Sequence, residues 1–175
     1  GISTRHNPEF TMMESYQAFG DYTEVMALTE ELITNASRDA RGTTTVVIQG
    51  NDFDLAQPWR KARMIDLASD ATGVTLHPSM DVAAVREVAA KHKIKCEKHW
   101  GSGRVIEEIF AELCEKDLIT PTFVTHHPVE ISPLARQDRN DPHLTERFEL
   151  FIGGREIANG YSELNDPIEQ RKRFE

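Results

Sequence analysis

The chain has little cysteine and no long hydrophobic run, and each absence excludes a class of protein. Its 175 residues include two cysteines, Cys96 and Cys114, and neither lies in a CxxC motif or a Cys/His spacing that would predict a zinc site. No apolar segment approaches the roughly 20 residues that a membrane-spanning helix needs. We therefore expect two reduced thiols in helices, no membrane partner and a cytoplasmic location.

Positive charge is also scarce. The chain has 20 Lys and Arg residues against 29 Asp and Glu residues, a formal net charge of −9. A protein that grips nucleic acid over its whole surface needs a basic excess, so this composition excludes that class and leaves only a local basic contact open. Three common catalytic signatures are absent as well: the P-loop, a GxGxxG loop after a strand, and a nucleophile elbow around Ser132.

The hydrophobic pattern predicts a single α+β domain. A length of 175 residues fits one domain with a sizeable core. Period-2 alternation predicts strands and 3.6-residue periodicity predicts helices. The predicted strands cover residues 10–19, 43–49, 121–125 and 147–152, and the predicted helices cover about 25–41, 64–71, 81–93 and 102–116. Strands at both ends and helices in the middle favour an antiparallel sheet flanked by helices.

Two acids are predicted to share one face of a hairpin near the C-terminus. If Gly153 and Gly154 form a two-residue turn, Phe151 lies opposite Glu156 and on the same face as Glu149. Two neighbouring carboxylates need either water or a cation, and Mg²⁺ is often held by carboxylates together with substrate phosphates. The alternative is a solvated face on which both acids point to water.

Three polar residues that follow the second acid form a possible specificity surface. Asn159, Tyr161 and Glu163 alternate onto one face, where a cationic ligand would satisfy the carboxylate of Glu163. Strict alternation places Glu156 on the opposite face. If both groups line one pocket, a bulge must intervene, and Gly160 is the predicted position. The alternative is a surface strand that ends in a loop.

The N-terminal segment has an ordered series of ligand-binding side chains. Arg5 and His6 are cationic and donor groups suited to phosphate. Phe10 could stack on a base, and in a strand it would share a face with Glu14 and Tyr16. The alternative for each is ordinary, with His6 in a loop and Phe10 in the core.

Residues 5–14, RHNPEFTMME, resemble the second half of motif 2 of class II lysyl-tRNA synthetases. Further segments fit the same family in the same order, and the resemblance covers essentially the whole chain. These segments are PTF at 121–123, PVEISPLAR at 128–136, RFE at 147–149 and GREIANGYSELND at 154–166.

The resemblance implies an incomplete class II catalytic core with a helical insertion at about 61–117. In this family the lysine carboxylate attacks the α-phosphate of ATP, and pyrophosphate leaves. The lysyl group of the resulting lysyl-adenylate then passes to tRNA(Lys). The implied partners are therefore ATP, L-lysine, tRNA(Lys) and, in the full-length protein, a second copy in a homodimer.

The resemblance also implies roles for individual residues. Tyr16 and Glu163 would receive the ε-ammonium of lysine, and Tyr161 stands where the family often has Phe. The implied ATP-binding residues are Arg5, His6, Phe10 and Glu149; the Mg²⁺ ligands are Glu149 and Glu156; the lysine-binding residues are Glu14, Tyr16, Asn159, Tyr161 and Glu163.

The family's remaining motifs are not found in these 175 residues. They are motif 1, the first half of motif 2 with its arginine, motif 3, and the anticodon-binding domain. We therefore expect a piece of a longer protein that is inactive, or nearly so, in isolation. Two alternatives stay open: a synthetase-like paralogue that lysylates a protein such as elongation factor P, and a non-catalytic lysine-binding module.

Overall fold

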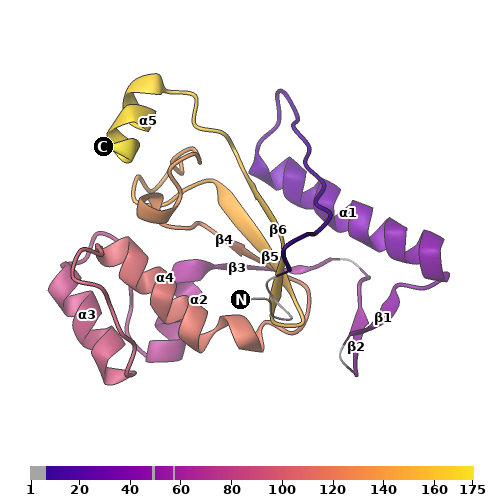
Figure 1. The fold of residues 1–175 in the computed structure, drawn as a ribbon, viewed down its shortest axis with the longest axis horizontal. Helices are drawn as coiled ribbons and strands as arrows, with labels where there is room; N and C mark the ends of the chain where they lie inside the picture. The colour runs from indigo at the N-terminus through magenta and orange to yellow at the C-terminus, as the bar shows by residue number, and fades with distance from the viewer. Residues whose placement is uncertain (1–6, 49, 57) are drawn as a thin grey trace.

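The computed structural model describes residues 7–48, 50–56 and 58–175. Its main sheet has the strand order β3-β4-β5-β6 (Figure 1). The strands are β3 (Arg60–Arg63), β4 (Thr122–Thr125), β5 (Arg147–Ile152) and β6 (Arg155–Tyr161). The β4-β5 and β5-β6 pairs are antiparallel, as expected, whereas β3 runs parallel to β4 and makes the sheet mixed. The predicted α+β architecture is confirmed.

Three helices between β3 and β4 form a layer over one face of this sheet. They are α2 (Met64–Thr72), α3 (Val82–Lys91) and α4 (Ser102–Leu113), and all three were predicted. A short 3-10 helix, η1 (Glu115–Asp117), follows α4, and a second, η2 (Val129–Ile131), follows β4. Glu130 lies beside the start of α4 and accepts hydrogen bonds from the backbone N–H groups of Gly101 and Arg104 at 2.7 and 3.2 Å. A carboxylate in this position satisfies helix donors that have no intrahelical partner.

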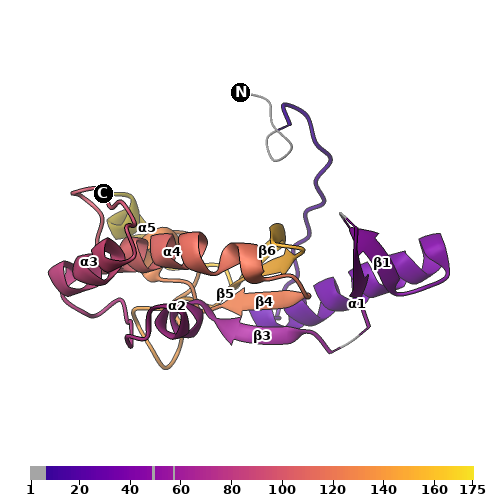
Figure 2. The same cartoon turned by 90° about the horizontal axis from the view of Figure 1, so that it is seen from below.

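The strands bury residues on both faces. Val124 and Phe151 join the core between the sheet and α2–α4, whereas Phe148 and Leu150 join a second core beside α1. Successive side chains in a strand point to opposite faces, which explains the division. Figure 2 shows α4 lying along one side of the sheet. Glu149 therefore belongs to the α4 side, because it alternates with Phe148 and Leu150.

Helix α1 (Tyr22–Arg41) is confirmed, but its buried face matches the predicted one only in part. Apolar periodicity favoured a face that includes Leu32 and Ala36, both of which are exposed. Met26 of the predicted face is buried, and Val25 and Ile33 pack against the second core. The buried face also carries Glu30 and Thr34, which bind the backbone of the following segment. Glu30 accepts from the N–H of Trp59 at 2.9 Å, and the Thr34 hydroxyl donates to a carbonyl at the same distance. Buried backbone groups need hydrogen-bond partners, and this explains why two polar residues lie on the buried face of the helix.

The remaining elements lie at the edges of the domain. A small hairpin joins β1 (Thr45–Ile48) to β2 (Asn51–Asp54), and β1 lies inside the predicted strand 43–49. Helix α5 (Pro167–Phe174) begins after Asp166, whose side chain caps it. No helix of the described residues is long and apolar enough to cross a membrane.

The predicted strand at 10–19 is not formed. Residues 7–20 contain neither helix nor strand, and Figure 2 shows this indigo segment leading away from the sheet. The side chains expected on one strand face, Phe10, Met12, Glu14 and Tyr16, are all exposed. Alternation alone cannot hold a strand, since its backbone groups need a neighbouring strand and its apolar face needs a cover.

Candidate functional site

The β5-β6 hairpin forms as predicted at its turn. Gly153 and Gly154 have φ angles of 63° and 68°. Two successive residues with positive φ are what a tight hairpin turn with the native strand twist requires, and glycine adopts them without strain. The register pairs Ile152 with Arg155 and Phe151 with Glu156, so the predicted pairing beside the turn is confirmed.

A bulge interrupts the ladder, as predicted, but not at Gly160. Leu150 pairs with Ala158 while the next residue of β5 pairs with Glu156, so Ile157 is the extra residue. Gly160 keeps a regular partner, Phe148. A Cβ atom at position 160 would lie 2.6 Å from the Phe148 ring. Glycine is therefore needed there for close packing rather than for the bulge.

The bulge brings the polar candidates onto one face. In the register, Asn159 lies opposite Glu149 and Tyr161 lies opposite Arg147. Glu156 pairs two residues further along the same face of β5. Without the extra residue, strict alternation would turn Glu156 away from Asn159 and Tyr161. The carboxylates of Glu149 and Glu156 thus face the same side of the hairpin as Asn159 and Tyr161.

Arg147 connects these side chains, and sequence reasoning missed it. Its guanidinium donates to Glu149 Oε1 at 2.7 Å and to Asn159 Oδ1 at 3.0 Å. It also donates to the Ile131 carbonyl at 2.9 Å and to Ser132 Oγ at 3.0 Å. A rigid fork with five donors can hold several acceptors at once. The sequence did contain a signal for this contact: Arg147 lies two residues before Glu149 on a strand, and this spacing places both side chains on one face.

The Glu149 carboxylate is largely buried, and other acids lie close to it. Burial is the main reason that its pKa rises to about 7; the Arg147 guanidinium opposes this rise, and the charges of Glu156 and Glu115 add to it. The ion pair with Arg147 is only about 15% exposed at the carboxylate. A cation placed beside Glu149 would stabilise its charged form and reduce its repulsion with Glu156 and Glu115.

The arrangement does not form a complete metal cage by itself. Among the described residues, no group of three or more His, Cys, Asp or Glu side chains is placed to hold a metal ion. Two carboxylates on one open face nevertheless suit Mg²⁺, which commonly takes its remaining ligands from water and substrate phosphates. The donor set of Glu149 and Glu156 therefore fits a magnesium ion that arrives with a phosphate ligand.

Glu163 lies in a segment that is tied down through its backbone. It pairs with Ala135 in an isolated bridge, and both neighbours also bond: Ser162 donates to Glu146 O and Leu164 to Leu134 O. The Glu163 side chain is exposed in this structure. Burial would require another segment or a ligand to cover it.

Helix α5 supports the loop behind Arg147. Arg173 of this helix is about 7% exposed and donates to the carbonyls of Ser132 and Ala135 at 3.1 and 2.7 Å. Its Nε atom also binds Glu169 at 3.1 Å. Ser132, which carries no nucleophile motif, therefore lies between two arginines and helps to position the first of them.

The N-terminal candidates that the structure describes, Phe10, Glu14 and Tyr16, are not packed against the hairpin. Phe10 is 72% exposed and Tyr16 is 82% exposed, and Glu14 is exposed too. Arg5 and His6 lie outside the described residues. The site in this structure therefore consists of the hairpin residues and their support.

The whole of this chain matches known proteins. The family described as tRNA synthetases class II (D, K and N) matches residues 1–175. The chain belongs to this family. The lysine--tRNA ligase of Bacillus subtilis is 47% identical over 175 residues, which is all of this chain and 35% of the relative. That of a Synechococcus strain is 51% identical over 176 residues, again all of this chain and 35% of the relative.

The synthetase chain spans about a third of the length of these relatives. A third relative, the lysine--tRNA ligase of Oceanobacillus iheyensis, is 45% identical and is covered to 36% of its length. The resemblance inferred from the motifs is confirmed by the family match and by these relatives.

Proposed function

We propose that this synthetase chain is part of a lysine--tRNA ligase, which activates lysine with ATP and transfers it to tRNA(Lys). Two findings support the proposal: the relatives above carry that name, and the chain matches them along its whole length. The structural observation that carries it is the shared face of the β5-β6 hairpin, where two acids, Glu149 and Glu156, lie on the same side as the amide of Asn159 and the phenol of Tyr161.

In this proposal Glu149 and Glu156 hold Mg²⁺ against the phosphates of ATP. The ion supplies charge neutralisation and orientation for the displaced pyrophosphate. Arg147 contributes by fixing Glu149 at 2.7 Å, so that one carboxylate oxygen is occupied and the other remains for the ligand. Arg5 and His6 would bind phosphate and Phe10 would stack on adenine.

The lysine substrate would occupy the opposite end of the same face. Asn159 accepts from Arg147 through its Oδ1 atom, which leaves its amide nitrogen for a ligand acceptor. Tyr161 supplies an aromatic wall. Glu163, with Tyr16, receives the ε-ammonium, and Glu14 completes the pocket. A neutral amino acid would leave the covered carboxylate of Glu163 without a partner, which is the basis of selectivity.

The N-terminal roles require residues 7–20 to fold back over this face. Their five exposed large apolar side chains would then be covered, and Glu163 would be removed from water. We also propose that the complete enzyme is a homodimer in the cytoplasm, where tRNA is aminoacylated for translation.

A single-atom change at Glu163 tests the lysine site in the full-length protein encoded by the gene. The change is Glu163→Gln, and the measurement is lysine-dependent exchange of pyrophosphate into ATP. We expect KM for lysine to rise about tenfold or more, because an ammonium loses its charged partner. Glu87→Gln, an exposed position on α3, is the matched control.

An unchanged lysine KM in Glu163→Gln would contradict the ammonium role while leaving the ligase proposal standing. Absence of lysine-dependent exchange in the unmodified full-length protein would contradict the ligase proposal itself.

A further inference from the structure

Lysine is concentrated in one short segment of this acidic chain. Of its seven lysines, four lie within eight residues: Lys91, Lys93, Lys95 and Lys98. We call residues 91–99, which connect the end of α3 towards α4, the cationic loop. It contains a single acid, Glu97, and carries two histidines. In a protein with a net charge of −9, this is a local reversal of sign.

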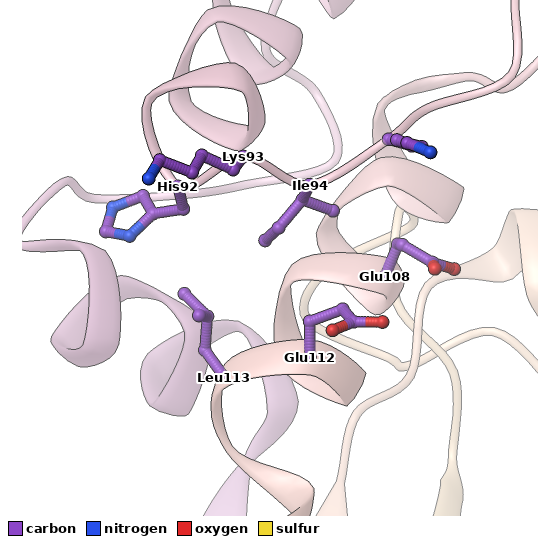
Figure 3. Close-up of a pocket in the computed structure, with 7 residues that line it drawn as sticks. His92, Lys93, Ile94, Glu108, Glu112 and Leu113 are labelled. Carbon is purple, nitrogen blue, oxygen red and sulfur yellow. The ribbon is translucent and has the colours of Figure 1, made fainter.

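The charges of the cationic loop are not neutralised within the described structure. All four lysines are exposed, and the ion pairs found among the described residues include Lys172 but none of these four. Lys93 and Lys95 line a hollow of about 380 Å³ together with two acids of α4, Glu108 and Glu112. Figure 3 shows the Lys93 side chain pointing away from both acids. Like charges that lie close together outside ion pairs are stabilised by an anionic partner.

The backbone of the cationic loop is held in place. Arg86 Nη2 donates to two carbonyls of the loop, those of Glu97 and Lys98, at 2.8 and 3.1 Å. It also donates to the carbonyl of Trp100, just after the loop, at 2.6 Å. The Trp100 ring in turn lies 4.6 Å from the Arg104 guanidinium. A loop fixed in this way loses less conformational entropy when it binds a partner.

Inward and outward residues alternate along the cationic loop. Ile94 and Cys96 pack against the core of α2–α4, whereas Lys93 and Lys95 are exposed. The apolar side chains thus face inward, so the outer surface offers ammonium groups without a group that would insert into lipid. This surface suits a hydrophilic polyanion better than a membrane.

We propose that the cationic loop binds the phosphate backbone of RNA, namely the tRNA that the proposed ligase aminoacylates. The inference rests on that proposed function and adds a contact on the helical layer, outside the hairpin site. Lysines that contact phosphates supply affinity without reading sequence, and the contact weakens as salt concentration rises.

Two matched double variants of the full-length protein test the contact. Lys93→Gln with Lys95→Gln removes two charges from the loop, and Lys61→Gln with Lys172→Gln removes two charges elsewhere. The readouts are tRNA binding against salt concentration, KM for tRNA in aminoacylation, and pyrophosphate exchange, which needs no tRNA. We expect the loop variant to bind tRNA about fivefold more weakly, since an exposed charge contact is worth only a few-fold.

The slope of log affinity against log salt should fall by roughly two in the loop variant, one for each lost phosphate contact. Exchange should not change, which separates the loop from the catalytic site. Equal effects in both variants, or tRNA binding that the loop variant leaves intact, would overturn the proposal. The proposal would also be overturned if the loop variant lost only binding to vesicles made of phosphatidylcholine and phosphatidylserine. If the unmodified protein shows no lysine-dependent exchange, the ligase proposal fails, whereas tRNA binding still tests the loop.

Discussion

At the scale of single residues, Arg147 determines how the hairpin side chains lie relative to one another. It binds Glu149, Asn159, Ser132 and the Ile131 carbonyl with one side chain. Lysine has the same charge but a single nitrogen with no planar fork, so it cannot reach all four acceptors. The geometry of the site therefore depends on the guanidinium as well as on its charge.

We expect Arg147→Lys to lower kcat/KM for lysine activation by about tenfold or more, because misplaced binding groups are costly in catalysis. Both KM for lysine and the Mg²⁺ concentration at half-maximal exchange should rise, since the two ends of the site share this residue. Arg171→Lys on the exposed side of α5 is the control. A variant with normal lysine and Mg²⁺ dependence would show that the fork is not needed.

His127 is a residue whose protonation should affect stability. It is fully buried, and burial lowers its pKa to about 3, with the Arg147 charge contributing in the same direction. A folded-state pKa below the unfolded value of about 6.5 means that the unfolded chain binds more protons at acidic pH. The contribution is therefore present above pH 6.5 and is lost as the pH falls toward 3.

We predict that the free energy of unfolding falls by up to about 1.4 kcal/mol per pH unit below pH 6.5 through this single group. His127→Gln should flatten that part of the profile, measured by urea unfolding at a series of pH values. His92→Gln, at an exposed position, is the control. Parallel profiles for the original protein and His127→Gln would contradict the assignment.

At the scale of elements, local pattern predicted much of the fold and missed what depends on distant neighbours. Helices α2, α3 and α4 and the hairpin register follow from periodicity and turn chemistry. Strand β3 has the sequence RKAR, which shows no strand pattern, and it is a strand because it pairs with β4. The face of α1 was predicted only in part for the same kind of reason, since two of its buried polar residues bind a segment that follows it.

Gly160 shows how tightly the two strands of the hairpin are packed. We expect Gly160→Ala to destabilise the protein by about 1–3 kcal/mol, the usual cost of forcing extra volume into a packed site. The new Cβ atom would meet the Phe148 ring at 2.6 Å. Urea unfolding measures the loss. Phe148→Leu should cost less stability in the Gly160→Ala background than in the original protein, because it also removes the clash. Equal costs in the two backgrounds would show that the ring is not the obstacle.

At the scale of the whole molecule, charge is distributed unevenly over the two surfaces for which we propose functions. Acids gather on the hairpin face, where the charges of Glu156 and Glu115 raise the pKa of Glu149. Lysines gather on the cationic loop. A net charge of −9 conceals both concentrations, because composition sums over positions that the fold separates. The acidic face suits a metal-bound phosphate and an ammonium, while the loop suits a polyanion.

The sequence by itself determined the family, the main helices, the glycine turn and the pairing beside it, because these depend on motifs and on neighbours a few residues apart. Only the tertiary structure decided that the bulge falls at Ile157, that Arg147 holds Glu149 and Asn159 together, and that residues 7–20 remain exposed. Each of these depends on groups that are distant along the chain. The position of a bulge is set by how the two strands pair across the hairpin, and an arginine binds acceptors that only the folded chain brings within reach.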